Sequence, residues 1–155
     1  MIRKAESKDI PQILRMLEQI LLLHHKTRPD LFRGQGTKYD ARELEQMLSR
    51  PQTPIFVYQQ GDTVTGYIMC QEQNARGHVL QPVKTLYIDD LCVDESARGK
   101  GVGRKLMEYA TDYARKNGFY NITLHVWEGN PGAMAFYRSA GLTTQYTSLE
   151  LIVKD

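Results

Sequence analysis

Apolar residues recur at helical spacing in three parts of the chain. One such stripe begins at Ile10 and predicts a helix over residues 8–24, with Ser7 and Asp9 before Ile10 as candidate helix caps. A second helix is expected over residues 40–49. A third is expected over Val102–Lys116, where small and apolar side chains share one face and charged side chains occupy most of the other. These stripes predict helices that each bury one side.

Stretches rich in β-branched and aromatic residues are typical of strands. The expected strands are a short opening strand before the first helix, Ile55–Gln60, Val64–Glu72, Thr85–Val93, Asn121–Trp127 and Gln145–Val153. Gly61 and Asp62 separate the first two long strands, so we expect a hairpin with a connection of two or three residues.

The rest of the chain adds a short helix and a long loop. Asn130 and Pro131 are typical of a cap and a first turn, and they predict a helix that reaches Ala140. Lys26–Tyr39 holds a proline and two glycines, and it is expected to be a loop that flanks a site. Strands occur both in a hairpin and in strand–helix–strand units, which predicts an α/β (α+β) fold with a mixed sheet and helices on both faces.

Composition adds limits to this fold. The 155 residues predict one domain, residues 1–155, and 41% hydrophobic with 25% charged residues is typical of a globular protein. A net charge of +2 gives no support for a nucleic-acid partner. The longest apolar run, Ile20–Leu23, is too short to cross a membrane, so we expect a cytoplasmic protein with no membrane contact.

Cysteine and histidine contribute little chemistry. Cys70 and Cys92 lie in strand-like runs and are expected to be buried thiols. The four histidines have no metal-ligand spacing, so no metal site is predicted. His125 is expected to be packed or to line a cleft.

A glycine-rich stretch, Arg98-Gly99-Lys100-Gly101-Val102-Gly103, joins the central strand to the third helix. Such a turn at a helix N-terminus either simply connects the two elements or binds phosphate through its N–H groups. A P-loop needs Ser or Thr after Gly-Lys, where Gly101 stands, and a dinucleotide fingerprint needs a glycine where Arg104 stands. The pattern that remains is R-x-x-G-x-G.

Three segments together resemble the GCN5-related N-acetyltransferase (GNAT) superfamily: Leu91-Cys92-Val93-Asp94, Arg98–Arg104, and Asn130–Arg138 with Gly141. The resemblance implies a mostly antiparallel sheet, a splayed acetyl-CoA cleft and acetyl-CoA as co-substrate. The pyrophosphate would lie on the glycine-rich loop, and the pantetheine arm would pair with Leu91 and Val93. The implied cofactor-binding residues are Leu91, Cys92, Val93, Arg98, Gly99, Lys100, Gly101, Val102, Gly103, Arg104, Asn130, Ala133, Phe136 and Tyr137.

Acetyl transfer to an amine requires a neutral amine. An alkyl amine with a pKa near ~10.4 is mostly protonated at pH 7, a penalty of roughly 4–5 kcal/mol that a general base relieves. Asp89, Asp90 and Glu128 are the candidate bases. In a regular strand Asp89 and Asp90 would point to opposite faces unless a β-bulge intervenes. The resemblance favours Asp89, while pairing with an arginine or a loop is the structural alternative for either.

A general acid for the departing thiolate is the other requirement. Tyr137 on the short helix is the candidate, because a phenol with a pKa near ~10 stays protonated at pH 7. The alternative is a tyrosine that packs in the core beside Phe136. Asn130 has two alternatives, a hydrogen bond to the pantetheine arm or a helix cap.

The expected function is therefore acetyl transfer from acetyl-CoA to a primary amine by direct attack. The alternatives are a non-catalytic acyl-CoA-binding module of the same fold and, less favoured, a nucleotide-binding protein. The acceptor, a small molecule or a protein amine, stays open. The apolar segment Leu149–Val153 is expected to be exposed and able to pair with another subunit, which makes a homodimer possible and leaves the oligomeric state open.

Overall fold

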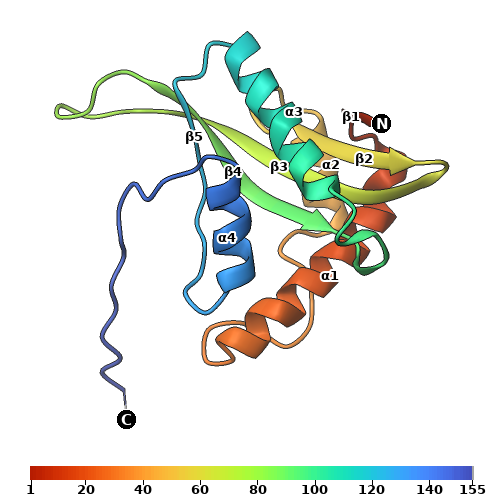
Figure 1. The fold of residues 1–155 in the computed structure, drawn as a ribbon, viewed down its shortest axis with the longest axis horizontal. Coiled ribbons are helices and arrows are strands. Elements are labelled where there is room, and N and C mark those ends of the chain that lie inside the picture. The colour runs from red at the N-terminus through yellow and green to blue at the C-terminus, as the bar shows by residue number, and fades with distance from the viewer. Residues whose placement is uncertain (155) are drawn as a thin grey trace. The chain divides into compact units, whose positions relative to one another are not determined.

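The computed structural model describes residues 1–154, and the chain divides into two compact units, Met1–His125 and Val126–Asp155 (Figure 1). The larger unit contains a sheet and most of the helices. The smaller unit contains one helix and an extended tail. The expectation of a single domain stays a prediction.

The larger unit follows the predicted order of helices and strands. Its elements are β1 (Ile2–Lys4), a 3₁₀ turn (Ser7–Asp9), α1 (Ile10–Thr27), α2 (Ala41–Leu48), β2 (Ile55–Gln60), β3 (Thr63–Asn74), β4 (Lys84–Val93), a second 3₁₀ turn (Glu95–Ala97), α3 (Val102–Lys116) and β5 (Asn121–Thr123). The strands form one sheet in the order β1-β2-β3-β4-β5. All neighbours are antiparallel except β4 and β5, which are parallel, so the expected mixed and mostly antiparallel sheet is confirmed.

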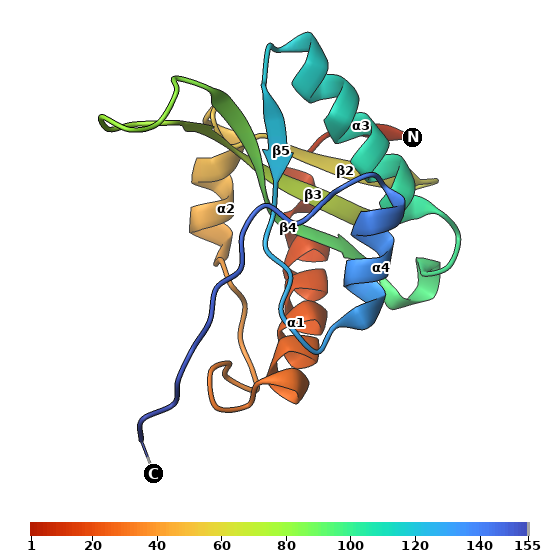
Figure 2. The ribbon, with the colours of Figure 1, turned by 60° about the vertical axis from the view of Figure 1, so that its left-hand side comes forward.

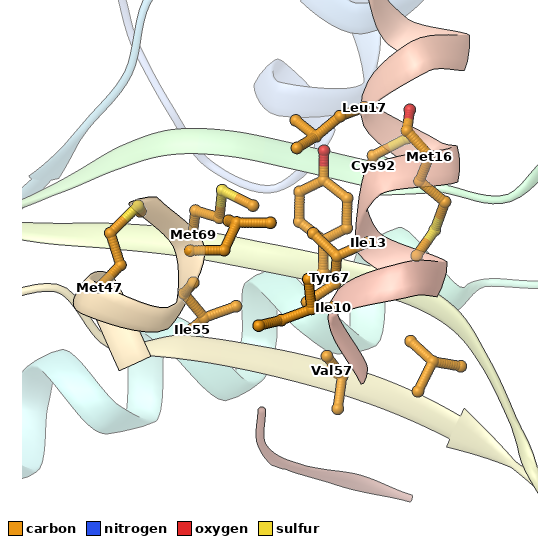
Figure 3. Close-up of a cluster of buried hydrophobic side chains, with 12 residues drawn as sticks. Ile10, Ile13, Met16, Leu17, Met47, Ile55, Val57, Tyr67, Met69 and Cys92 are labelled. Carbon is orange, nitrogen blue, oxygen red and sulfur yellow. The ribbon is translucent and has the colours of Figure 1, made fainter. Parts of the chain in front are cut away.

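Helices cover both faces of this sheet, as predicted (Figure 2). On one face, α1 and α2 pack on side chains from alternate positions of β2, β3 and β4, and Figure 3 shows this cluster around Tyr67. Ile13 and Leu17 of α1 are fully buried there. Burying each such side chain contributes about 1.5–3 kcal/mol to stability.

On the other face, α3 lies against β3 and β4, and its approach depends on Gly66. A Cβ at Gly66 would lie 2.9 Å from Cγ1 of Val102 and 3.1 Å from Cδ1 of Leu106. Because those distances leave no room for a methyl group, the absent side chain lets the first turn of α3 pack directly on β3. This contact positions the N-terminus of α3 beside the end of β4.

One strand prediction was wrong in extent. The strand expected over Asn121–Trp127 ends at Thr123, because its pairing with β4 stops at Tyr87. His125 lies beyond it, exposed, with its ring 5.4 Å from that of Tyr87, so it is not a packed residue.

The smaller unit contains α4 (Pro131–Ser139), which starts and ends close to the prediction. The strand expected over Gln145–Val153 is absent: these residues are extended but hydrogen-bonded in no sheet that the structure describes. Four apolar side chains in this tail are 65–90% exposed: Leu149, Leu151, Ile152 and Val153. A strand needs a partner edge, which the tail does not find among the described residues of its own chain.

The predicted character of the cysteines is confirmed, since Cys70 and Cys92 are free and buried. Burial raises the pKa of each thiol to about 12, which keeps both protonated at neutral pH. Within residues 1–154, no helix has the length and apolar character needed to cross a membrane.

Candidate active site

A β-bulge interrupts β4 at the two candidate carboxylates. Met69 of β3 pairs with Asp90, but its neighbour Cys70 pairs with Ile88, so Asp89 is an extra residue without a partner in β3. The inserted residue changes the alternation of side chains, and Asp89 and Asp90 both point to the face covered by α1 and α2. The expectation of opposite faces for a regular strand therefore does not hold. We call Asp89 and Asp90 the acidic pair.

Each member of the acidic pair has its own partners. The hydroxyl of Tyr39 donates to Oδ2 of Asp89 at 2.5 Å, and Nζ of Lys38 donates to Oδ1 of Asp89 at 3.0 Å. The hydroxyl of Tyr67 donates to Oδ2 of Asp90 at 2.8 Å. Asp89 thus uses both oxygens on the loop before α2, whereas the side-chain partner of Asp90 is Tyr67 of β3.

The environment changes the acidity of these groups. Burial raises the pKa of Asp90 to about 6, and the neighbouring charge of Asp89 acts in the same direction. Burial, and then the contact with Asp89, raise the pKa of the Tyr39 hydroxyl. Burial and the charge of Asp90 raise the pKa of Tyr67. A carboxyl that titrates near 6 flanked by protonated phenols is suited to accept a proton at neutral pH.

Beyond the bulge, one edge of β4 has no strand partner in the described chain. β5 pairs with β4 only over Thr85–Tyr87, so the edge is open from Ile88 onward. The backbone N–H of Asp94 donates to the carbonyl oxygen of Thr65 in β3 at 2.8 Å. Because backbone groups alternate along a strand, the N–H groups of Leu91 and Val93 point to the open edge.

Cys92 takes no part in that edge. Its backbone points toward β3 by the same alternation, and its Sγ lies 3.6 Å from the carbonyl oxygen of Met16 in α1. The side chain belongs to the core under α1.

The glycine-rich segment follows β4 after the 3₁₀ turn Glu95–Ala97, and we call Arg98–Arg104 the phosphate loop. Gly99 and Gly101 have φ values of +77° and +79°, which side chains rarely allow. A Cβ added at either position would meet nothing within 4 Å, so these positions face open space. Gly101 is the N-cap of α3, whose first N–H groups and dipole favour an anion at this end.

The charged side chains of the phosphate loop are held in different ways. Nε of Arg98 donates to the carbonyl of Val93 at 3.2 Å, and Nζ of Lys100 donates to the carbonyl of Ser96 at 3.2 Å. Nε of Arg104 lies 3.6 Å from Oε1 of Glu108, and the Arg104 side chain is 70% exposed. Lysine and arginine side chains with so few contacts can reorient toward an anion.

Asp94, the N-cap of the 3₁₀ turn that precedes the phosphate loop, is a structural residue that the sequence did not single out. It is buried and accepts hydrogen bonds from the N–H and hydroxyl of Ser96, and from Nε2 of Gln19 at 3.1 Å. These bonds, those of Ser96 first, lower the pKa of Asp94. Asp94 therefore links the 3₁₀ turn before the phosphate loop to α1, which no local sequence signal indicates.

The remaining candidates lie in the smaller unit. Oδ1 of Asn130 accepts the N–H of Ala133 at 3.2 Å, so Asn130 is a helix cap, one of its two expected roles. The rings of Phe136 and Tyr137 meet edge to face at 5.1 Å. Glu128 is exposed in the turn before α4.

Lys38, Tyr39 and Tyr67 are further site residues that the sequence did not single out. Their contacts with the acidic pair join positions that are 23 to 51 residues apart in the chain. The loop around Tyr39 was expected to flank a site, and that was the only available signal.

Comparison with known proteins places the chain among acetyltransferases. The family model described as "Acetyltransferase (GNAT) family" matches residues 18–142. Over 151 residues the chain is 27% identical to a thialysine N-epsilon-acetyltransferase from Bos taurus, covering 91% of this chain and 82% of that one.

Solved structures share the fold of this chain. A mutant of the BH1408 protein from Bacillus halodurans has a TM-score of 0.95 at 29% identity and covers 99% of both chains. An aminoglycoside acetyltransferase from a soil metagenomic sample has a TM-score of 0.69 at 18% identity, which shows a shared fold.

Proposed function

This chain belongs to the acetyltransferase (GNAT) family, and on that premise we propose that it transfers the acetyl group of acetyl-CoA to a primary amine by direct attack. The observation that carries this proposal is the bulge in β4. It turns two carboxylates to one face of the strand whose open edge runs on to the phosphate loop. A candidate cation site on β4 is thus followed in the chain by a candidate anion site at the N-terminus of α3.

The residues present fit acetyl-CoA. The positive φ values at Gly99 and Gly101 suit a turn of N–H groups around the diphosphate, and both positions are open to solvent. The N–H groups of Leu91 and Val93 can pair with the amide groups of a pantetheine arm as an added strand does. When bound, acetyl-CoA supplies an acetyl group activated as a thioester.

The acidic pair is suited to receive an ammonium group. Asp89, with a side chain only 6% exposed, provides fixed negative charge, and Asp90 provides the carboxylate that accepts a proton from the amine. Tyr67 orients Asp90 by its hydrogen bond. Tyr137 is the residue that we assign as proton donor to the departing sulfur, on the resemblance of its motif.

The similarity to a thialysine N-epsilon-acetyltransferase supports a primary alkyl amine as the acceptor. We propose an acceptor with a positively charged amine, because two carboxylates attract a cation and disfavour an anion. A small molecule and an exposed protein amine both meet this requirement.

The test is release of free thiol from acetyl-CoA over a panel of amines, among them amino acids, polyamines, aminoglycosides and lysine peptides. We expect Tyr137→Phe to lower kcat by about 10²-fold with little change in the KM for acetyl-CoA. Tyr120→Phe is the matched control, since Tyr120 is 75% exposed in the larger unit.

Two outcomes would contradict the proposal. Binding of acetyl-CoA without thiol release from any amine would favour the non-catalytic acyl-CoA-binding module. Tighter binding of ATP or NAD than of CoA would favour a nucleotide-binding protein instead.

A further inference from the structure

The loop before α2 carries a primary amine that already lies on the acidic pair. Nζ of Lys38 is 3.0 Å from Oδ1 of Asp89 and 3.2 Å from the backbone carbonyl oxygen of the same residue. That carbonyl belongs to the extra residue of the bulge. Lys38 thus occupies the position where a cationic acceptor would bind.

The loop that holds Lys38 is anchored on both sides. At its start, the carbonyl of Phe32 is hydrogen-bonded to Nδ1 of His25 at 2.8 Å, and the ring of Phe32 stacks on His24 at 4.9 Å. At its end, Tyr39 bonds to Asp89. The Lys38 side chain itself is 48% exposed, so its amine reaches the acidic pair while its stem keeps room to move.

Other lysines of the larger unit have different contacts. Lys8 pairs with Glu6, Lys84 lies over the ring of Phe119, and Lys105 lies over the ring of Tyr58. Among the described residues, Lys38 is the only lysine that forms a hydrogen bond or an ion pair with the acidic pair.

We propose that Lys38 is an acetylation site of this protein, modified by the same chain on which it lies. This inference rests on the proposed function, which supplies acetyl-CoA and the base. The bond between Nζ and the acetyl carbon forms, and the thioester C–S bond breaks with its electron pair leaving on sulfur. Of the two protons that the ammonium loses, one ends on the sulfur and the other passes through a carboxylate of the acidic pair to water.

The geometry favours Lys38 over an exposed lysine for two reasons. A carboxylate held at 3.0 Å orients the amine, and reactions of oriented groups within one molecule gain large effective concentrations. A nearby base also removes the proton that keeps the amine unreactive. The product is a neutral amide, which can no longer form the ion pair with Asp89.

The experiment incubates the purified chain with trideuteroacetyl-CoA and follows label at each lysine by peptide mass spectrometry. The deuterated group separates this reaction from acetylation during expression. Lys26 and Lys116, both exposed, report purely chemical acetylation. We expect Lys38 to be labelled at least about tenfold faster than either, because orientation accelerates only the bound amine.

Two further conditions sharpen the result. Labelling in urea should reduce Lys38 to the rate of the two control lysines. The rate constant at Lys38 should stay the same when the protein is diluted a hundredfold. Equal labelling of the three lysines in the folded protein, or a rate constant that rises in proportion to protein concentration, would overturn the inference.

Thiol release with external amines, measured on the same sample, separates this inference from the function on which it rests. Release with an amine but no preferred label at Lys38 would reject the modification and keep the transferase. If the sample shows no thiol release and no label at Lys38, both the transferase function and the modification are rejected.

Discussion

The carboxylates of Asp89 and Asp90 differ in their partners and therefore in the roles they can take. Asp89 uses one oxygen on Tyr39 and the other on Lys38, so its charge is committed to the loop. Asp90 accepts hydrogen bonds from the hydroxyl of Tyr67 and from the backbone N–H of Leu91, and burial raises its pKa to about 6. The sequence resemblance favoured Asp89 as the base, whereas these contacts favour Asp90 as the proton acceptor and Asp89 as the anchor.

Asp90→Asn tests this assignment. We expect kcat/KM to fall by about 10²–10⁴-fold, the usual contribution of a general base. In the unaltered chain, kcat/KM should decrease as pH falls through about 6, because protonation removes the acceptor. The variant should lose that inflection. The measurement is a pH–rate profile from pH 4.5 to 9.

Asp90→Asn should also change how the stability of the fold depends on pH. A raised pKa means that the folded chain binds this proton more tightly than the unfolded chain does. The free-energy contribution of Asp90 therefore declines as pH rises from about 4 through about 6. We expect Asp90→Asn to raise Tm more at pH 8 than at pH 4.5.

Asp62→Asn is the control, because Asp62 is exposed in the β2–β3 hairpin and should change neither Tm nor the pH–rate profile. A pH–rate profile of Asp90→Asn that keeps the inflection near 6 would contradict the assignment.

At the scale of elements, β4 and the phosphate loop divide the site into two parts with different requirements. The acidic pair depends on side chains and on the bulge, whereas the phosphate loop depends on backbone conformation at two glycines. The loop was predictable, because glycine is the residue type that adopts positive φ, and the pattern of Gly99 and Gly101 can be seen locally in the sequence. The bulge was not, since it arises from the register between β3 and β4.

Gly101→Ala tests the phosphate loop. An alanine at φ +79° costs roughly 1–2 kcal/mol, and its methyl group would project into the space open at that position. We expect the KM for acetyl-CoA to rise by about tenfold, which corresponds to about 1.4 kcal/mol. The kcat at saturating acetyl-CoA should change little. Steady-state kinetics with varied acetyl-CoA measures both.

Gly118→Ala provides the matched control. Gly118 follows the other end of α3 with φ +73°, and a Cβ there also meets nothing within 4 Å. Its backbone strain should lower Tm by an amount similar to that of Gly101→Ala without changing the KM for acetyl-CoA. An equal rise in KM for both variants would mean that strain, rather than the phosphate loop, causes the effect.

At the scale of the whole molecule, the C-terminal tail stands apart from the pattern of apolar burial. Leu149, Leu151 and Val153 are each 85–90% exposed, although the larger unit buries side chains of this type under its helices. An extended apolar segment favours pairing with another chain. We propose that a second copy of this chain covers it, a pairing that the sequence pattern leaves open.

Leu149→Glu combined with Leu151→Glu tests the homodimer. We expect the unaltered chain to sediment as a dimer at micromolar concentration and the double variant as a monomer, because two buried charges oppose association. Thr147→Glu, at an exposed polar position of the same tail, should remain dimeric. A monomeric unaltered chain would contradict the proposal.

The sequence by itself determined the helices, most strands, the turn at Gly61 and Asp62, and the phosphate loop. Each of these depends on periodicity or on residues next to one another. It also placed Asp89 and Asp90 on the central strand. The glycine-rich segment Arg98–Arg104 and the segment Asn130–Arg138 indicated the family that the comparisons confirm.

Only the tertiary structure decided which face those carboxylates share and what touches them. The bulge depends on pairing with β3, and Lys38 reaches Asp89 across 51 residues of chain. The loss of the last strand has the same origin, because a strand requires an edge that its own residues do not supply. Contacts between distant segments depend on how the whole sheet is assembled, and no local pattern in the sequence encodes that assembly.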